Sequence, residues 1–162
     1  MTPIFGRALR FGQAITTWDG PRRSSSVIFS RDTITSEVLR ACRGLPLLGP
    51  EHAGPQVGTV DWVEADRDGL RFAGRLYHDA LDLPKQLSIA VDYHHPAGQD
   101  LRQATRIDGL KHIALCEAGC CSGTWWRTGR LGQWPDEPLP TPVSIALMHA
   151  RREEARRGGT HG

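Results

Sequence analysis

The chain has 162 residues, of which 39% are hydrophobic and 23% are charged, and its formal net charge is +2 at pH 7. These values are typical of one globular domain that is long enough to bury a core. A net charge this small gives no reason to expect nucleic-acid binding. The sequence contains no apolar run of transmembrane length and no N-terminal signal pattern, so we expect a cytoplasmic protein without membrane contact.

The first part of the chain predicts two strands, a loop and a helix. Residues 4–14 alternate as a strand that glycines interrupt, whereas residues 16–26 are polar and rich in glycine, proline and serine, as in a loop. A short strand is expected at 27–29. Asp32 stands where it can cap a helix over 33–42, whose apolar residues fall on one face.

The middle of the chain predicts short strands joined by turns. The segment Asp66-Arg67-Asp68-Gly69 is typical of a hairpin turn, and Asp108-Gly109 predicts a second break. Residues 79–85 are expected to form a short connection. The expected strands are 45–48, 57–65, 70–77, 87–94, 101–107 and 110–116. About seven strands with one or two helices predict a mainly β protein with flanking helices, as in a small β-barrel, although the count also fits many sandwiches.

The composition changes after residue 117, where glycines and prolines become frequent. Three tryptophans lie in this stretch: Trp125, Trp126 and Trp134. We expect them to pin the loop onto the barrel. Thr141 and the proline after it predict the start of an amphipathic helix over 142–157. We therefore expect a barrel domain at 1–117, which folds without the rest, and a loosely attached loop and helix at 118–162.

Three residues in apolar, strand-like contexts are candidates for a catalytic site: His52, Ser88 and His112. If the branched neighbours of Ser88 and His112 face a core, both side chains point away from it, because residues alternate along a strand. A serine nucleophile needs a base, and the base needs a third group that holds its tautomer. Each residue alone also fits an ordinary structural position. As a set they predict that Ser88 Oγ lies within about 4 Å of a His52 ring nitrogen.

The order of these motifs resembles that of the prohead proteases of tailed phages, which are relatives of the herpesvirus assemblins. The matching elements are Ile4–Ala14, His52, Val57–Val60, Gly69–Gly74, Leu87–Ile89 and Leu110–Cys116. The resemblance covers roughly residues 3–117. It implies a herpes-protease-like β-barrel with Ser88 as nucleophile, His52 as general base and acid, and His112 as the group that orients His52.

The same resemblance implies a serine endopeptidase that acts without a cofactor. Its substrates would be scaffold and capsid proteins, which it would cleave during procapsid maturation, inside the procapsid in the cytoplasm of the host cell. Family members often process themselves and assemble with the scaffold, so self-cleavage and a homo-oligomer are both compatible with the resemblance.

The chain departs from many phage members of the family in two places. Where many phage members carry a carboxylate, this chain has His112, and the assemblins also have a second histidine at that place. Ala114 stands where those phage members usually have a serine. A neutral imidazole stabilises an imidazolium less than a carboxylate does, so we expect slow turnover. Two candidates for the oxyanion donor stay open, Arg127 and a backbone amide near Ser88.

Two alternative functions stay open as well. The departures are compatible with a catalytically inactive barrel that serves as a scaffold or capsid-assembly module. Cys116, Cys120, Cys121 and His112 offer four zinc ligands on paper, which would suit a small zinc-binding module. Adjacent cysteines do not easily reach one tetrahedral ion, and a C-x-x-C pair is lacking. We therefore expect no structural metal.

Overall fold

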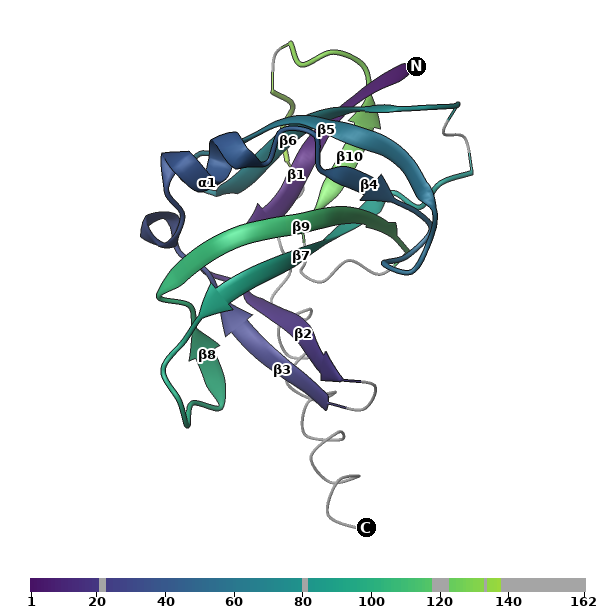
Figure 1. The fold of residues 1–162 in the computed structure, drawn as a ribbon. Coiled ribbons are helices and arrows are strands. Elements are labelled where there is room, and N and C mark those ends of the chain that lie inside the picture. The colour runs from purple at the N-terminus through teal and green to yellow at the C-terminus, as the bar shows by residue number, and fades with distance from the viewer. Residues whose placement is uncertain (21–22, 80–81, 118–122, 133, 138–162) are drawn as a thin grey trace.

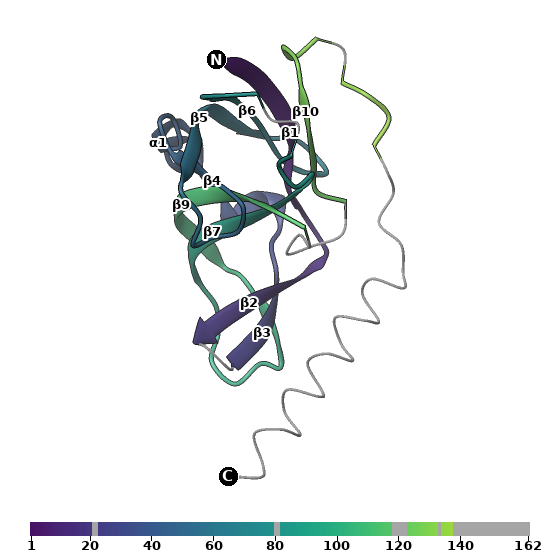
Figure 2. The same cartoon turned by 90° about the vertical axis from the view of Figure 1, so that its right-hand side faces the viewer.

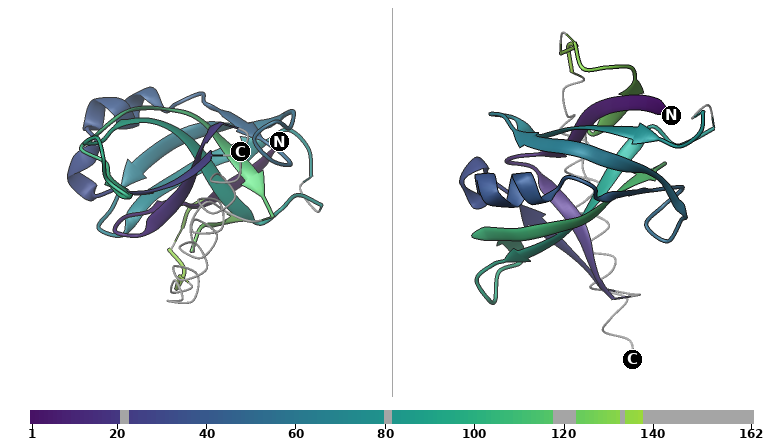
Figure 3. Two further views of the ribbon diagram at one scale, coloured as in Figure 1. Left: turned by 90° about the horizontal axis from the view of Figure 1, so that it is seen from below. Right: turned by 45° about the horizontal axis from the view of Figure 1, so that its top comes forward.

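The structure is a computed structural model that describes residues 1–20, 23–79, 82–117, 123–132 and 134–137. Within these ranges a seven-stranded sheet curls into a half-barrel, and a three-stranded sheet extends from one end of it (Figure 1). The curl of the larger sheet is visible when the molecule is seen from below (Figure 3). The predicted fold class, mainly β with flanking helices, is confirmed.

The larger sheet contains, in spatial order, β10 (Trp125–Thr128), β1 (Thr2–Arg10), β6 (Gly69–Leu76), β5 (Gln56–Ala65), β4 (Pro46–Leu48), β9 (Arg106–Cys116) and β7 (Gln86–His94). The smaller sheet contains β2 (Ala14–Gly20), β3 (Arg23–Ile28) and β8 (Leu101–Gln103). A 3-10 turn, η1 (Arg31–Thr33), precedes the helix α1 (Ser36–Ala41), which lies beside β5 and β9. Neither of these described helices is long and apolar enough to cross a membrane.

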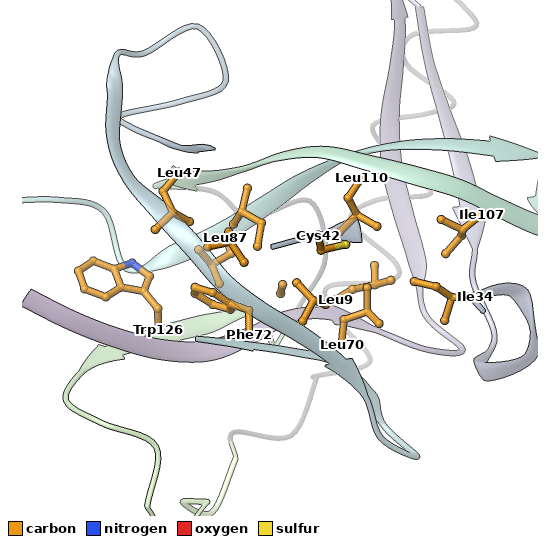
Figure 4. Packing of buried hydrophobic residues seen from close by; sticks show 14 of the residues in the cluster. Leu9, Ile34, Cys42, Leu47, Leu70, Phe72, Leu87, Ile107, Leu110 and Trp126 are labelled. Atoms are coloured by element: carbon orange, nitrogen blue, oxygen red, sulfur yellow. The ribbon is translucent and has the colours of Figure 1, made fainter. Parts of the chain in front are cut away.

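The core lies inside the curl of the larger sheet. Its buried side chains come from strands on both sides of the half-barrel and from the α1 region, and they include Leu9, Ile34, Cys42, Leu47, Leu70, Phe72, Leu87, Ile107, Leu110 and Trp126 (Figure 4). Leu87 is fully buried, and burial of a leucine contributes about 1.5–3 kcal/mol. In the first half of β7 the odd-numbered side chains therefore point toward the core.

The segment predicted as a loop at 16–26 is a hairpin instead. Strands β2 and β3 pair antiparallel, from Ala14 opposite Ile28 to Gly20 opposite Arg23. Strand β3 also pairs in parallel with β8, which comes much later in the chain (Figure 1). The β2–β3 hairpin is seen from a second side in Figure 2. The polar composition of residues 16–26 indicates a loop, but these residues form strands because the small sheet is stabilised by backbone pairing with a distant strand. A local sequence pattern does not reveal such a contact.

Two further boundaries differ from the prediction. The helix is capped by Thr35 rather than Asp32, since Thr35 Oγ1 accepts a hydrogen bond from the Val38 N–H at 3.3 Å. Strand β9 runs through Asp108 and Gly109 without a break, because its pairing with β7 shifts register there and absorbs the irregularity. The expected hairpin turn is confirmed, and Asp66 Oδ1 accepts from the N–H groups of Asp68 and Gly69 at 2.8 and 2.9 Å.

The described residues after position 117 include a strand and side chains that contact the barrel. Strand β10 pairs with β1, and Trp125 and Trp126 are buried. Glu137 accepts hydrogen bonds from Arg7 and Arg10 of β1 at 2.5 to 3.0 Å. The expected helix at 142–157 lies outside the described residues, and the domain boundary after residue 117 stays a prediction.

Candidate active site

Ser88 is the second residue past the start of β7, on the face of the strand that points away from the core. Its neighbours Leu87 and Ile89 contribute to the core, and alternation along the strand therefore turns Ser88 outward. Ser88 pairs with Ala114 of β9 and is 7% exposed. The side chain is thus held on a rigid strand and shielded by its surroundings.

His112 lies on β9, the strand that pairs with β7. Its register partner is Ala90, so His112 is diagonal to Ser88 across the two strands and on the same face. Ile113 and Leu115 are fully buried on the other face of β9. The outward orientation predicted for Ser88 and His112 is what the structure has.

His52 comes from the loop between β4 and β5, which is tied to β9 by its backbone. The Glu51 N–H donates to the Leu115 carbonyl at 2.9 Å, and the Gly54 N–H donates to the Glu51 carbonyl at 3.1 Å. Glu51 has a positive φ of 66°, an unusual conformation for a residue with a side chain. A Cβ on Gly54 would lie 2.3 Å from the Pro50 carbonyl oxygen, so the loop closes tightly around His52.

The three side chains form one line of hydrogen bonds. His52 Nε2 lies 2.7 Å from Ser88 Oγ, and His52 Nδ1 lies 2.7 Å from His112 Nε2. The predicted proximity of Ser88 and His52 is therefore met. If Ser88 donates its hydroxyl proton to His52 Nε2, the proton of neutral His52 is on Nδ1 and is donated to His112 Nε2. One choice of tautomers satisfies the whole line.

Both histidines favour the neutral form. Loss of surrounding water lowers the pKa of His52 below its usual value of about 6.5, and the charge of Glu51 opposes this in part. Burial also lowers the pKa of His112, and the charges of His52 and Lys111 lower it further. At neutral pH His52 is thus an unprotonated base beside a serine hydroxyl, the arrangement that activates a serine nucleophile.

Other residues considered from the sequence lie elsewhere. Arg127 is exposed on β10 with its guanidinium 5.3 Å from the centre of the Trp125 ring, and among the described residues it has no contact with the three site residues. Cys116 is buried, and Cys120 and Cys121 lie outside the described residues. No group of metal-binding side chains is found in the described ranges, and the expected absence of zinc stays a prediction.

Two described residues of the segment after β9 had no signal in the sequence. Thr124 bonds to the backbone of Leu87, the residue before Ser88, and Glu137 binds two arginines of β1. Both lie in the Gly/Pro-rich stretch, where neither side chain belongs to a recognisable pattern. Only the folded chain brings them to their partners.

Comparison with known proteins gives similarity to solved structures alone. No protein-family model matches the chain, and no curated protein is a recognisable relative. Among solved structures the chain is similar to the Kaposi's sarcoma herpesvirus protease in complex with an allosteric inhibitor, with 10% identity and a TM-score of 0.49, over 95% of this chain and 90% of that chain. A similarity this low decides nothing about activity, substrate or partner.

Proposed function

We propose that this protein is a serine endopeptidase in which Ser88 is the nucleophile, His52 the general base and acid, and His112 the group that orients His52. The observation that carries the proposal is the line of hydrogen bonds from Ser88 Oγ through both nitrogens of His52 to His112 Nε2. The low pKa of His52 supports it, because a neutral imidazole is available to accept a proton.

The proposed reaction uses these groups in sequence. Ser88 Oγ attacks the carbonyl carbon of the scissile peptide while His52 Nε2 takes the hydroxyl proton. The resulting imidazolium donates from Nδ1 to His112 and gives the proton at Nε2 to the leaving amine, so the peptide C–N bond breaks and an acyl-serine forms. Water then attacks the acyl-serine, with His52 again acting first as base and then as acid.

The proposed substrates come from the resemblance to phage prohead proteases. We propose that the enzyme cleaves scaffold and capsid proteins during procapsid maturation in the host cytoplasm, and that it processes itself. The chemistry of the site supports an acyl-transfer enzyme. The order of the sequence motifs supports peptide bonds as the bonds cleaved and scaffold and capsid proteins as the substrates.

The test combines a substrate-independent probe with a cleavage assay. Purified protein is treated with a fluorophosphonate, which labels an activated serine, and the chain is co-expressed with phage scaffold and capsid proteins as trial substrates. We expect Ser88→Ala to abolish labelling and cleavage, whereas Ser30→Ala, at an exposed serine outside the site, leaves both unchanged.

The same assays assign the role of His112. His112→Ala should keep weak activity. Its rate should stay on the order of a hundredfold above the rate of Ser88→Ala, because an orienting group contributes less than the nucleophile. Full activity of His112→Ala would remove His112 from the triad. A folded wild-type protein that neither binds the probe nor cleaves would favour the inactive assembly module.

A further inference from the structure

The side chain of Thr124 bonds to the backbone of β7, which is an edge strand of the larger sheet. Thr124 Oγ1 accepts a hydrogen bond from the Leu87 N–H at 3.2 Å and donates one to the Leu87 carbonyl at 3.0 Å. Thr124 is 6% exposed and lies immediately before β10, at the opposite edge of the larger sheet from β7. One hydroxyl thus links the two edges of the half-barrel at Leu87.

This contact bears directly on the geometry of Ser88. The Leu87 carbonyl and the Ser88 N–H belong to the same planar peptide unit, so a hydrogen bond that fixes the carbonyl also fixes the plane that enters Ser88. On its other side Ser88 is paired with Ala114 of β9. The backbone that carries the Ser88 hydroxyl is therefore held from two directions, one of them supplied by Thr124.

Thr124 is itself held from both sides along the chain. On one side, the Arg10 guanidinium donates from Nε to the Gly123 carbonyl at 3.3 Å and from Nη2 to Glu137 at 2.7 Å. On the other, Trp126 Nε1 donates to the Pro84 carbonyl at 2.7 Å, just before β7 begins. These contacts leave the Thr124 hydroxyl little freedom to move away from Leu87.

We propose that Thr124 is a positioning residue for the nucleophile, acting through the peptide plane between Leu87 and Ser88. The proposal rests on the proposed function of Ser88 and gives the segment after β9 a part in the active site. Thr124 does not touch the reacting atoms. Its hydroxyl holds Ser88 Oγ at the angle and distance from His52 Nε2 that proton transfer requires, and a displacement of about 1 Å is enough to slow such a step roughly a hundredfold.

The experiment compares three variants of the full chain. Thr124→Val keeps the shape and removes the hydroxyl, Thr124→Ser keeps the hydroxyl, and Thr128→Val makes the same change at an exposed residue of β10. The readouts are the maximal rate and half-saturating concentration of fluorophosphonate labelling, hydrogen exchange of the Leu87 amide, and the ¹⁵N signal of His52 Nε2.

We expect Thr124→Val to lower the maximal labelling rate by about tenfold or more with an unchanged half-saturating concentration, since probe binding does not involve Thr124. The Leu87 amide should exchange faster and the His52 signal should shift. Thr124→Ser should stay within about threefold of wild type, and Thr128→Val should match it. If Thr124→Val does not fold, Thr124→Cys takes its place and must show the same losses.

Two results would overturn the proposal. One is a folded Thr124→Val that is labelled at the wild-type rate although its Leu87 amide exchanges faster. The other is a Thr124→Ser as slow as Thr124→Val, because the hydroxyl would then not be the cause. If the wild-type protein itself is not labelled, the proposed function fails, and the His52 signal alone decides the positioning role: a shift in Thr124→Val supports it and an unchanged signal refutes it.

Discussion

Ser88, His52 and His112 reach one another from backbones of different kinds. Ser88 and His112 sit on two paired strands whose other faces are buried, so their positions follow from the packing of the core. His52 sits on a loop whose backbone is tied to β9 at Leu115. Substitutions at the strand residues are therefore expected to report on chemistry, whereas the placement of His52 depends on the loop.

The pH dependence of the site follows from the His52 pKa, which lies below its usual value of about 6.5. Because the neutral imidazole is the active base, the labelling rate of Ser88 should rise with pH through a midpoint below that value and stay flat to neutral pH. Glu51→Gln should move the midpoint lower, since the Glu51 charge raises the His52 pKa. The measurement is the fluorophosphonate labelling rate across the acidic range, and a midpoint above the usual value would contradict this account.

At the scale of elements, the loop between β4 and β5 and the strand β9 act together as the support of the two histidines. The loop is compact because Gly49 donates to the Pro55 carbonyl at 3.1 Å and Gly54 donates to Glu51. Its closure leaves no room for a side chain at Gly54, where a Cβ would meet backbone atoms of Pro50 and Gly49 at 2.3 and 2.7 Å.

Gly54→Ala should therefore displace His52 while leaving the buried core intact. We expect the labelling rate to fall about a hundredfold, because proton transfer is sensitive to small displacements, with only a small change in melting temperature. Gly109→Ala is the matched control: it lies on β9 near His112, and an added Cβ there meets no atom within 4 Å. Equal labelling of the two variants would show that the tightness of the loop does not position His52.

At the scale of the whole molecule, the described residues between 123 and 137 connect both edges of the larger sheet, through the pairing of β10 with β1 and the bonds from Thr124 to Leu87. Strand β10 extends the sheet beyond β1, and Glu137 accepts from Arg7, Arg10, Trp125 and Trp134. Burial alone would raise the pKa of Glu137, but the hydrogen bonds from Arg7 and the tryptophans outweigh it and hold the pKa at about 2. The carboxylate thus stays charged beside Arg7, which is 1% exposed.

Truncation tests this role of the segment. A chain of residues 1–118 should be less stable than a chain of residues 1–137, by roughly 5 kcal/mol or more, because it loses two buried tryptophans and leaves the buried Arg7 without Glu137. Such a loss is expected to lower the melting temperature by more than about 15 °C or to prevent folding. Thermal unfolding followed by circular dichroism measures it. Equal melting temperatures would instead support the division after residue 117 that the composition predicts.

The features that the sequence determined by itself are local ones. The alternation of β7 and β9 turns Ser88 and His112 outward whatever lies beside them, because side chains alternate along any strand. The Asp66–Gly69 turn forms from its own side-chain and backbone bonds. For the same reason the mainly β class and the outward orientation of Ser88 and His112 could be predicted from the sequence. The catalytic roles of these two residues and of His52 stay a prediction.

What only the tertiary structure decided is the set of partners that are far apart in the chain. The pairing of β3 with β8, the pairing of β1 with β10 and the bond from Thr124 to Leu87 join residues whose local sequences carry no sign of one another. A strand edge offers the same N–H and C=O groups to any neighbour, so its partner is selected by the packing of the whole core. That is why the hairpin of β2 and β3 and the pairing of β10 with β1 could not be predicted from the sequence.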